Sequence, residues 1–184
     1  ISVTILTKNS EARLAQCLDA LKGFDEVIVL DNGSTDQTLA IARQYPNVCV
    51  HEHPFLGFGK MRNLSVSFCK NDWILWVDSD EVLDPILIQN IQNLSLNPKH
   101  LYRFLRKQYY NGKYINGAGW GNDKVTRLFH KNSTQFNDKD VHEGLNAKGL
   151  QVIDIEGVIH HYSYETADQL LAKMNYYSTL FAVQ

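Results

Sequence analysis

Cysteine, proline and methionine are scarce in this sequence, and their scarcity narrows the classes of protein to consider. The 184 residues include three cysteines, four prolines and two methionines. The cysteines are odd in number, scattered and without a C-x-x-C pair, so they predict reduced thiols that pack as small hydrophobic groups, not a disulfide framework. No apolar run approaches the roughly 20 residues of a membrane-spanning helix. We therefore expect a cytoplasmic protein.

The sequence also has no excess of basic over acidic residues. Lys and Arg number 18 and Asp and Glu number 20, which gives a net charge of -2. Nucleic-acid-binding domains usually carry a basic footprint, so we expect no nucleic-acid partner. The P-loop pattern G-x-x-x-x-G-K-[ST] does not occur, and its absence counts against an ordinary ATPase or kinase. A hydrophobic content of 44% and a charged content of 21% are typical of a globular domain.

The first hundred residues alternate β-branched apolar runs with segments of helical periodicity. This order is typical of an α/β fold with a mostly parallel central sheet flanked by helices. Capping residues mark several expected helix starts: Asn9 or Ser10, the box Ser34-x-x-Gln37, and Asp84 followed by Pro85. We expect strands at 1–6, 27–30, 48–50 and in the run ending at Asp78, and helices at 10–22, 34–45, 59–68 and after 84.

The second half of the sequence is less regular. It is rich in aromatic and glycine residues, and the segments Arg127–Phe129 and Val152–Ile155 predict further strands, which we expect to be antiparallel. We predict one domain over residues 1–184, with a nucleotide-type half at 1–98 and a less regular half at 99–184. Because Gln184 falls inside an apparent helix, we expect the chain to be truncated at its C-terminus.

Polar residues follow three of the expected parallel strands at the points where the strands end. Thr7, Asp31 and the pair Asp78 and Asp80 occupy these positions. Ligands of open α/β sheets bind outside the carboxyl ends of the strands. Two aspartates one residue apart can face a hard divalent cation that shares oxygen ligands with a substrate phosphate. The pair therefore predicts a metal-held phosphate, although ordinary turn chemistry also explains the segment 31–36.

Three further segments have a functional and a structural interpretation. Glycines precede Lys60 and Arg62, which could hold a diphosphate or remain solvated surface cations. Glu143 follows an acidic loop and could act as a general base or belong to a charged surface. One imidazole of the pair His160-His161 could complete a metal site beside Asp80, or both could be structural.

Aromatic residues are concentrated in the second half, among them Trp120. Aromatic faces are good platforms for sugar rings, and flanking glycines would let a loop move over a bound substrate. Peripheral packing of these rings against the sheet is the alternative.

The segments Ser2–Asn9, Val27–Asp36 and Trp76–Asp80 together resemble the family 2 glycosyltransferases, whose GT-A fold is a single nucleotide-sugar-binding α/β domain. The resemblance covers nearly the whole chain. The later segments Arg127–Phe129, Val141–Glu143 and His161–Tyr164 resemble a bacterial branch that adds β-1,4-linked glucose to the inner core of lipopolysaccharide.

The resemblance implies a role for each matching residue. The uracil contact would come from Asn32 or Asp31, since many relatives have two aspartates there. His161 would approach the metal, with His160 a close competitor. The implied roles are nucleoside binding by Thr7, Asn9, Asp31 and Asn32; ribose binding by Asp78; metal binding by Asp80 and His161; diphosphate binding by Lys60, Arg62 and Arg127; and proton abstraction by Glu143. The aromatic platform at Trp120 would bind the acceptor.

The implied activity is an inverting transfer of a hexose, glucose, from UDP-glucose to a saccharide or lipid-linked saccharide, with Mg²⁺ or Mn²⁺ as cofactor. The lipopolysaccharide inner core would be the acceptor, and the enzyme would touch the inner face of the cell membrane peripherally. A nucleotidyltransferase is an alternative, but it would show a glycine-rich basic loop after the first strand. A non-catalytic sugar-nucleotide-binding module is another, and it would not need Glu143.

Overall fold

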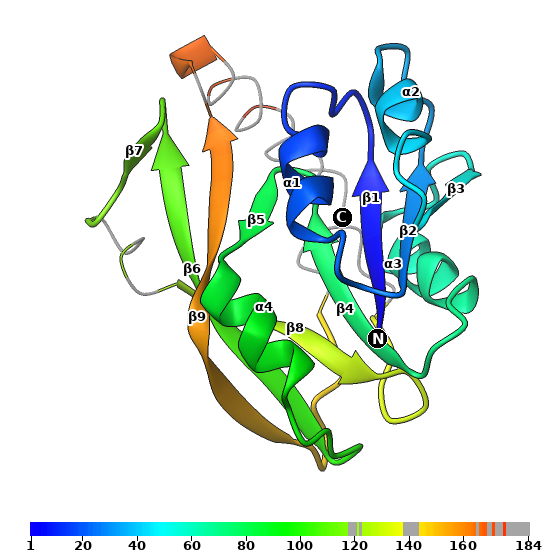
Figure 1. Ribbon diagram of the computed structural model, residues 1–184, viewed down its shortest axis with the longest axis vertical. Helices are drawn as coiled ribbons and strands as arrows, with labels where there is room; N and C mark the ends of the chain where they lie inside the picture. Colours follow the sequence, from blue (N-terminus) through cyan, green and yellow to red (C-terminus); the bar gives the residue numbers. More distant parts are fainter. Residues whose placement is uncertain are drawn as a thin grey trace.

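Four parallel strands form the first half of a mixed sheet in the computed structural model, which describes residues 1–117, 121, 123–137, 144–164, 166–168, 171 and 175. Their arrowheads point to one edge, as β1 and β2 show in Figure 1. The strands are β1 (Ser2–Thr7), β2 (Glu26–Asp31), β3 (Val48–Glu52) and β4 (Trp73–Asp78), and the helices between them are α1 (Leu14–Ala20), α2 (Thr38–Ala42) and α3 (Phe58–Ser67).

The second half adds longer strands that curl the sheet. The elements are β5 (Glu81–Leu83), α4 (Pro85–Gln92), β6 (His100–Tyr110), β7 (Lys113–Tyr114), β8 (Asp123–His130) and β9 (Gln151–Tyr164). The strand order is β3-β2-β1-β4-β8-β6-β9-β5, and β7 pairs with β6. Strand β8 is antiparallel to both neighbours, β9 is parallel to β6, and β5 is antiparallel to β9. The loop after β4 is thereby joined to the end of β9.

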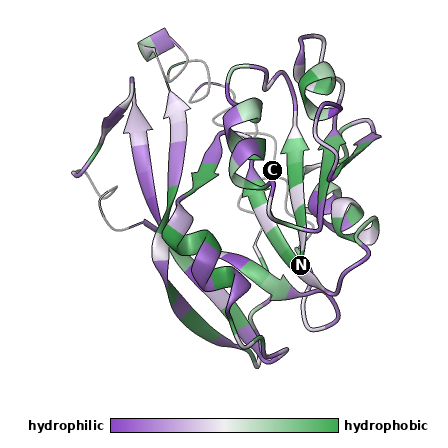
Figure 2. Ribbon diagram, in the orientation of Figure 1, coloured by the Kyte–Doolittle hydropathy of each residue, from purple (hydrophilic) through white to green (hydrophobic). Residues whose placement is uncertain are grey.

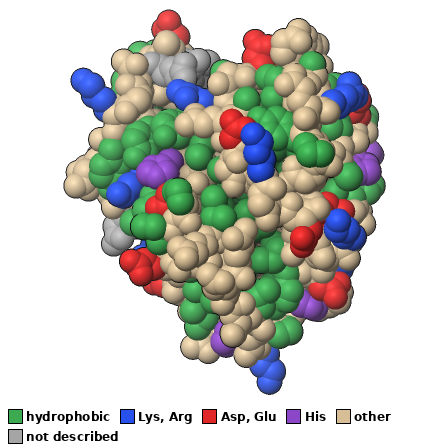
Figure 3. Space-filling model, viewed as in Figure 1, with side chains coloured by type: hydrophobic (Ala, Val, Ile, Leu, Met, Phe, Trp, Pro, Cys, Tyr) green, Lys and Arg blue, Asp and Glu red, His purple; other side chains and the backbone are tan. Residues whose placement is uncertain are grey.

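The main core lies between the parallel strands and the helices α1 and α4. Figure 2 shows β1, β2 and β4 as mostly hydrophobic, in keeping with strands that are covered on both faces. Helix α4 packs closely on β9, where Gly157 has φ +121° and a Cβ added to it would lie 2.5 Å from the Cα of Leu87. Basic and acidic side chains are interspersed on the face shown in Figure 3.

The predicted fold class is confirmed, and the local predictions have mixed outcomes. Asp84 caps α4 by accepting the Leu87 N–H at 2.7 Å, as expected. The cap predictions at the two other helices are wrong, because α1 begins at Leu14 and α2 at Thr38, both without a side-chain cap. The antiparallel prediction holds for β8 but is wrong for Val152–Ile155, since that part of β9 runs parallel to β6.

Two of the three cysteines are packed as predicted. Cys17 and Cys69 are buried, whereas Cys49 is exposed on the edge strand β3. Among the described residues, no helix is both long enough and apolar enough to cross a bilayer.

Candidate active site

The sheet brings the three polar strand ends together. In the register of the parallel block, Thr7 pairs with Asp31 and Leu6 pairs with Asp78, so β1, β2 and β4 end side by side. The Thr7 hydroxyl donates a hydrogen bond to Asp31 Oδ1 at 2.8 Å. The hydroxyls of Ser10 and Ser79 lie 2.9 Å apart and link the loop after β1 to the loop after β4. The loops at the predicted ligand-binding edge of the sheet are therefore linked to one another by hydrogen bonds.

Asp31 braces the loop that follows β2. Its carboxylate is fully buried and accepts hydrogen bonds from the Thr7 hydroxyl, the Gly33 N–H, and both the N–H and the hydroxyl of Ser34, at 2.5 to 2.9 Å. Burial alone would raise the pKa of Asp31, but the bonds from Ser34, Thr7 and Gly33 lower it below its usual value. Asn9, at φ 50°, accepts the Thr35 N–H at 2.8 Å and ties the first loop to the second.

Asp80 and His161 meet because β5 pairs with β9. Glu81 is the register partner of His161, and the Tyr162 N–H donates to the Asp80 carbonyl at 2.9 Å. The Asp80 Oδ1 and His161 Nε2 atoms lie 3.2 Å apart. His160 points elsewhere, with its Nδ1 atom 2.9 Å from the Tyr109 hydroxyl, and burial lowers its pKa. The structure thus places His161, not His160, beside Asp80.

The Asp80–His161 pair offers one carboxylate oxygen and one imidazole nitrogen to a cation. Among the described residues, no group of three His, Cys, Asp or Glu side chains could hold a metal ion. A two-residue donor set fits a divalent cation such as Mg²⁺ or Mn²⁺ that takes its other ligands from substrate phosphates and water. It does not fit a closed structural zinc site, which needs four protein ligands.

Two arginines from different elements form ion pairs with Asp78. Arg62 of α3 donates to Asp78 Oδ1 at 2.5 Å, and Arg127 of β8 donates to Oδ2 at 2.8 Å. Burial would raise the pKa of Asp78, but Arg127 and Arg62 hold it well below its usual range. Both guanidinium groups lie over the Trp76 ring, with their Cζ atoms 4.2 Å and 3.5 Å from its centroid. Two of the three predicted diphosphate ligands, Arg62 and Arg127, are therefore bound to a carboxylate in this structure.

Glu81 belongs to the same carboxylate cluster of the sequence as Asp78 and Asp80, but no role was predicted for it. Its side chain is fully buried and accepts from Arg127 at 2.5 Å, from Arg106 at 3.2 Å, and from the Asp78 N–H at 3.0 Å. Arg106 also donates to Asp123 at 2.8 Å. Three carboxylates and three arginines thus alternate along one buried to half-buried network: Asp78, Glu81, Asp123, Arg62, Arg106 and Arg127.

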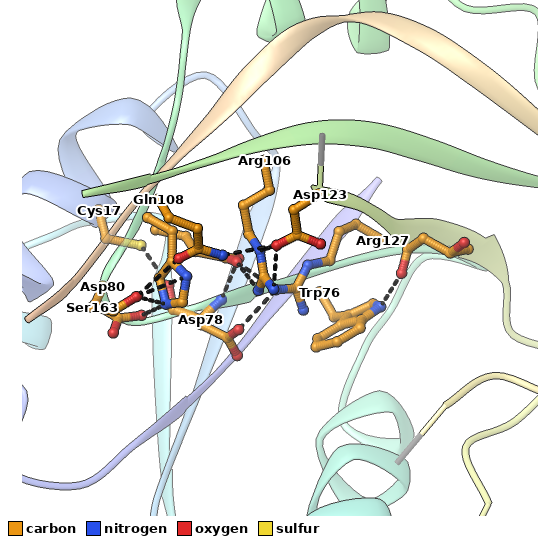
Figure 4. A network of polar contacts seen from close by, with 12 residues as sticks. Cys17, Trp76, Asp78, Asp80, Arg106, Gln108, Asp123, Arg127 and Ser163 are labelled. Atoms are coloured by element: carbon orange, nitrogen blue, oxygen red, sulfur yellow. Dashed lines mark hydrogen bonds and ion pairs between the residues drawn. The ribbon is translucent and has the colours of Figure 1, made fainter. Parts of the chain in front are cut away.

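The polar network continues from Asp123 back to His161. Gln108 donates to Asp123 at 2.8 Å, and the Ser163 hydroxyl donates to Gln108 at 3.1 Å while lying 3.0 Å from His161 Nδ1. In Figure 4, Arg106 and Asp123 lie between Arg127 on one side and Asp80 with Ser163 on the other. Alternate positions on β6 and β9 carry these polar groups, and that two-residue spacing is the one sequence signal that could have identified them.

The remaining predicted residues have different placements. Lys60 is exposed on α3 and has no hydrogen-bond or ion-pair partner among the described residues. The Asn32 Oδ1 atom is buried, and no described group donates to it. Glu143 and Trp120, predicted as the base and the acceptor platform, lie outside the described residues.

Comparisons with known proteins agree on the type of domain. Residues 2–151 match the model of the family described as glycosyl transferase family 2. An uncharacterized glycosyltransferase of Rickettsia prowazekii is 32% identical over 97% of this chain, and the chain spans 65% of that relative's length. The lipopolysaccharide core biosynthesis glycosyltransferase LpsC of Rhizobium meliloti is 27% identical over 100% of the chain and 71% of the relative.

A solved structure shows the same fold. The crystal structure of residues 1–349 of S. aureus TarS in complex with UDP-GlcNAc has a TM-score of 0.63 and 20% identity, covering 92% of this chain and 60% of that one.

Proposed function

Because the chain belongs to glycosyl transferase family 2, we propose that it transfers a hexose, glucose, from a UDP-sugar to a saccharide acceptor with inversion at the anomeric carbon. The observation that carries this proposal is the Asp80–His161 pair, whose facing atoms lie 3.2 Å apart beside Asp78 at the carboxyl ends of β1, β2 and β4. The two residues are 81 positions apart in sequence and meet only through the β5–β9 pairing. Ligands of open α/β sheets bind at this edge, and that supports a metal-held nucleoside diphosphate at the pair.

The loops after β1 and β2 would hold the nucleoside. Asp31 already accepts four hydrogen bonds, so we assign it the role of fixing the loop together with Thr7 and Asn9. We assign the uracil contact to Asn32, because its buried Oδ1 atom is an acceptor without a described donor and a uracil ring presents an N–H. Asp78 would accept from the ribose hydroxyls, since each carboxylate oxygen has a second lone-pair site beyond its arginine bond.

Asp80 and His161 would hold Mg²⁺ or Mn²⁺. When bound, the cation acts as a Lewis acid that offsets the charge developing on the departing diphosphate. We assign Lys60 on α3 a direct contact to phosphate, and the support is that Lys60 is exposed and no described residue neutralises its charge. Arg62 and Arg127 would act on the diphosphate chiefly by fixing Asp78.

Glu143 would be the general base and Trp120 an acceptor contact. In one in-line step, the acceptor oxygen forms a bond to the anomeric carbon while the bond from that carbon to the diphosphate oxygen breaks. Glu143 takes the hydroxyl proton. A positioned base contributes about 10² to 10⁴ in rate, so Glu143→Gln should slow transfer by that factor and leave donor binding unchanged.

A lipopolysaccharide inner core is the acceptor that we propose. The support is the 27% identity to LpsC over the whole of this chain. Such an acceptor is lipid-linked, so the enzyme would work in the cytoplasm at the inner face of the cell membrane.

The test is calorimetric binding of UDP and UDP-glucose in Mn²⁺ and then in EDTA. We expect binding that needs the metal and that Asp80→Asn abolishes, while the surface variant Glu52→Gln binds like the parent. Binding in EDTA as tight as in Mn²⁺ would refute the metal assignment. Binding of UDP without UDP-glucose would refute glucose as the donor sugar, and binding of neither would refute a uridine nucleotide as the donor.

A further inference from the structure

Ser163 and Gln108 form a polar pair beside His161, on the same side of the sheet. His161 and Ser163 are two positions apart on β9 and so share a face, and Gln108 is the register partner of His161 on β6. The Ser163 Oγ atom lies 3.0 Å from Nδ1 and 3.1 Å from Nε2 of His161. It also donates to Gln108 Oε1 at 3.1 Å, and Gln108 is 8% exposed. The ring of His161 is thereby held from the protein interior.

The chemistry of the neighbouring groups fixes the direction of the hydrogen bonds that run from Asp123 through Gln108 to Ser163. Asp123, which Arg106 holds at 2.8 Å, is a carboxylate and can only accept. The Gln108 amide nitrogen must therefore face Asp123, at 2.8 Å, and its oxygen must face Ser163. Ser163 has a single hydroxyl hydrogen, which it gives to Gln108. Its oxygen can then only accept from an N–H of His161.

The Ser163 oxygen lies nearly equidistant from the two ring nitrogens of His161, at 3.0 Å from Nδ1 and 3.1 Å from Nε2, and Nε2 also lies 3.2 Å from Asp80 Oδ1. We propose that Ser163 and Gln108 are positioning residues that hold the His161 ring in this orientation, so that Nε2 and Asp80 together bind a divalent cation. The inference rests on the proposed function, which assigns Asp80 and His161 to the metal.

Groups that orient a metal-binding histidine are worth about 10- to 100-fold in metal affinity. We expect Ser163→Ala to weaken the binding of Mn²⁺ by that factor, measured with UDP present by calorimetry and by the electron paramagnetic resonance signal of free Mn²⁺. Ser163→Thr keeps the hydroxyl and should restore the affinity. The matched control is Ser67→Ala, which removes an exposed hydroxyl bonded to the Leu64 carbonyl of α3.

Gln108→Met, which keeps the length of the side chain but loses its polar atoms, should weaken Mn²⁺ binding as Ser163→Ala does. Because both residues act through one contact, the double variant should bind Mn²⁺ with the same affinity as the single variant that shows the larger loss. Fully additive losses would contradict a shared path to His161.

Other outcomes separate this inference from the function on which it rests. If Ser163→Ala binds Mn²⁺ like Ser67→Ala while His161→Ala loses it, the positioning role is wrong and the metal site stands. If Ser163→Thr loses as much as Ser163→Ala, the hydroxyl is not what holds the ring, and the inference falls. If His161→Ala and Asp80→Asn both bind Mn²⁺ like the parent, the metal assignment fails and the inference fails with it.

Discussion

Replacing Glu81 by glutamine should destabilise the protein strongly, although the change removes no atom from the packing. Glu81 is fully buried and Arg127 is 1% exposed, so the pair is shielded from water. The variant would leave three arginines with two carboxylates in the network. Its amide must also point its NH₂ group either at the arginines or at the Asp78 N–H, and each choice sets donor against donor.

Removing one partner of a buried ion pair costs about 3 to 5 kcal/mol. In a chain of this length, 1 kcal/mol shifts the melting temperature by about 2 to 4 °C, so Glu81→Gln should melt roughly 6 to 20 °C below the parent. Urea unfolding followed by circular dichroism measures the same loss as a lower midpoint. The control is Glu52→Gln, whose carboxylate pairs with Arg43 at 3.0 Å with both side chains more than half exposed. That change should cost about 1 kcal/mol at most. Equal losses in the two variants would refute the reasoning.

Three further predictions concern stability. The pKa of Asp78 is lower in the folded than in the unfolded protein, so its ionised form stabilises the fold above the unfolded pKa near 3.9, and this stabilisation is lost as the pH falls through the folded pKa. The difference in urea midpoint between Asp78→Asn and the parent should therefore shrink below about pH 4. A difference that stays constant with pH would contradict this. Gly157→Ala should lower the free energy of unfolding by more than the roughly 1 to 3 kcal/mol of backbone strain alone, because the new Cβ meets Leu87. Gly112→Ala, at φ +69° with no atom near the new Cβ, should cost only the strain. Similar urea midpoints for the two variants would count against the close approach of Leu87. Asp84→Ala should lose about 1 kcal/mol with the helix cap, and an unchanged midpoint would show that the cap is dispensable.

The features that the sequence predicted correctly depend on local patterns. Short β-branched runs ending in polar residues predicted β1, β2 and β4, and parallel pairing then brings their ends together without further information. The cap at Asp84 was likewise readable, because a capping carboxylate and a first-turn proline act on adjacent residues. The Ser34 cap failed because its oxygen accepts another donor: Ser34 Oγ accepts the Asn9 N–H at 2.8 Å while Ser34 donates its own hydroxyl and N–H to Asp31, and the helix starts later, at Thr38.

The polar network could not be predicted because long-range pairing decides its members. Arg106 reaches Asp123 only through the β6–β8 register, which shifts between Tyr102 and Arg103. A shift of one residue on a strand turns every later side chain to the other face, and no local pattern reveals it. Likewise, the choice between His160 and His161 depends on which of them pairs with Glu81 across β5 and β9.

The balance of charge in the network changes how a negatively charged donor would be held. Arg62 and Arg127 looked like diphosphate ligands in the sequence, but each is bound to a carboxylate, and the three arginines are matched by three acidic side chains. A matched set of charges attracts an anion weakly, because the opposite fields cancel beyond the contact distance. We therefore expect the attraction for a diphosphate to come from a cation at Asp80 and His161 and from Lys60, while the arginines keep Asp78 ionised and in place.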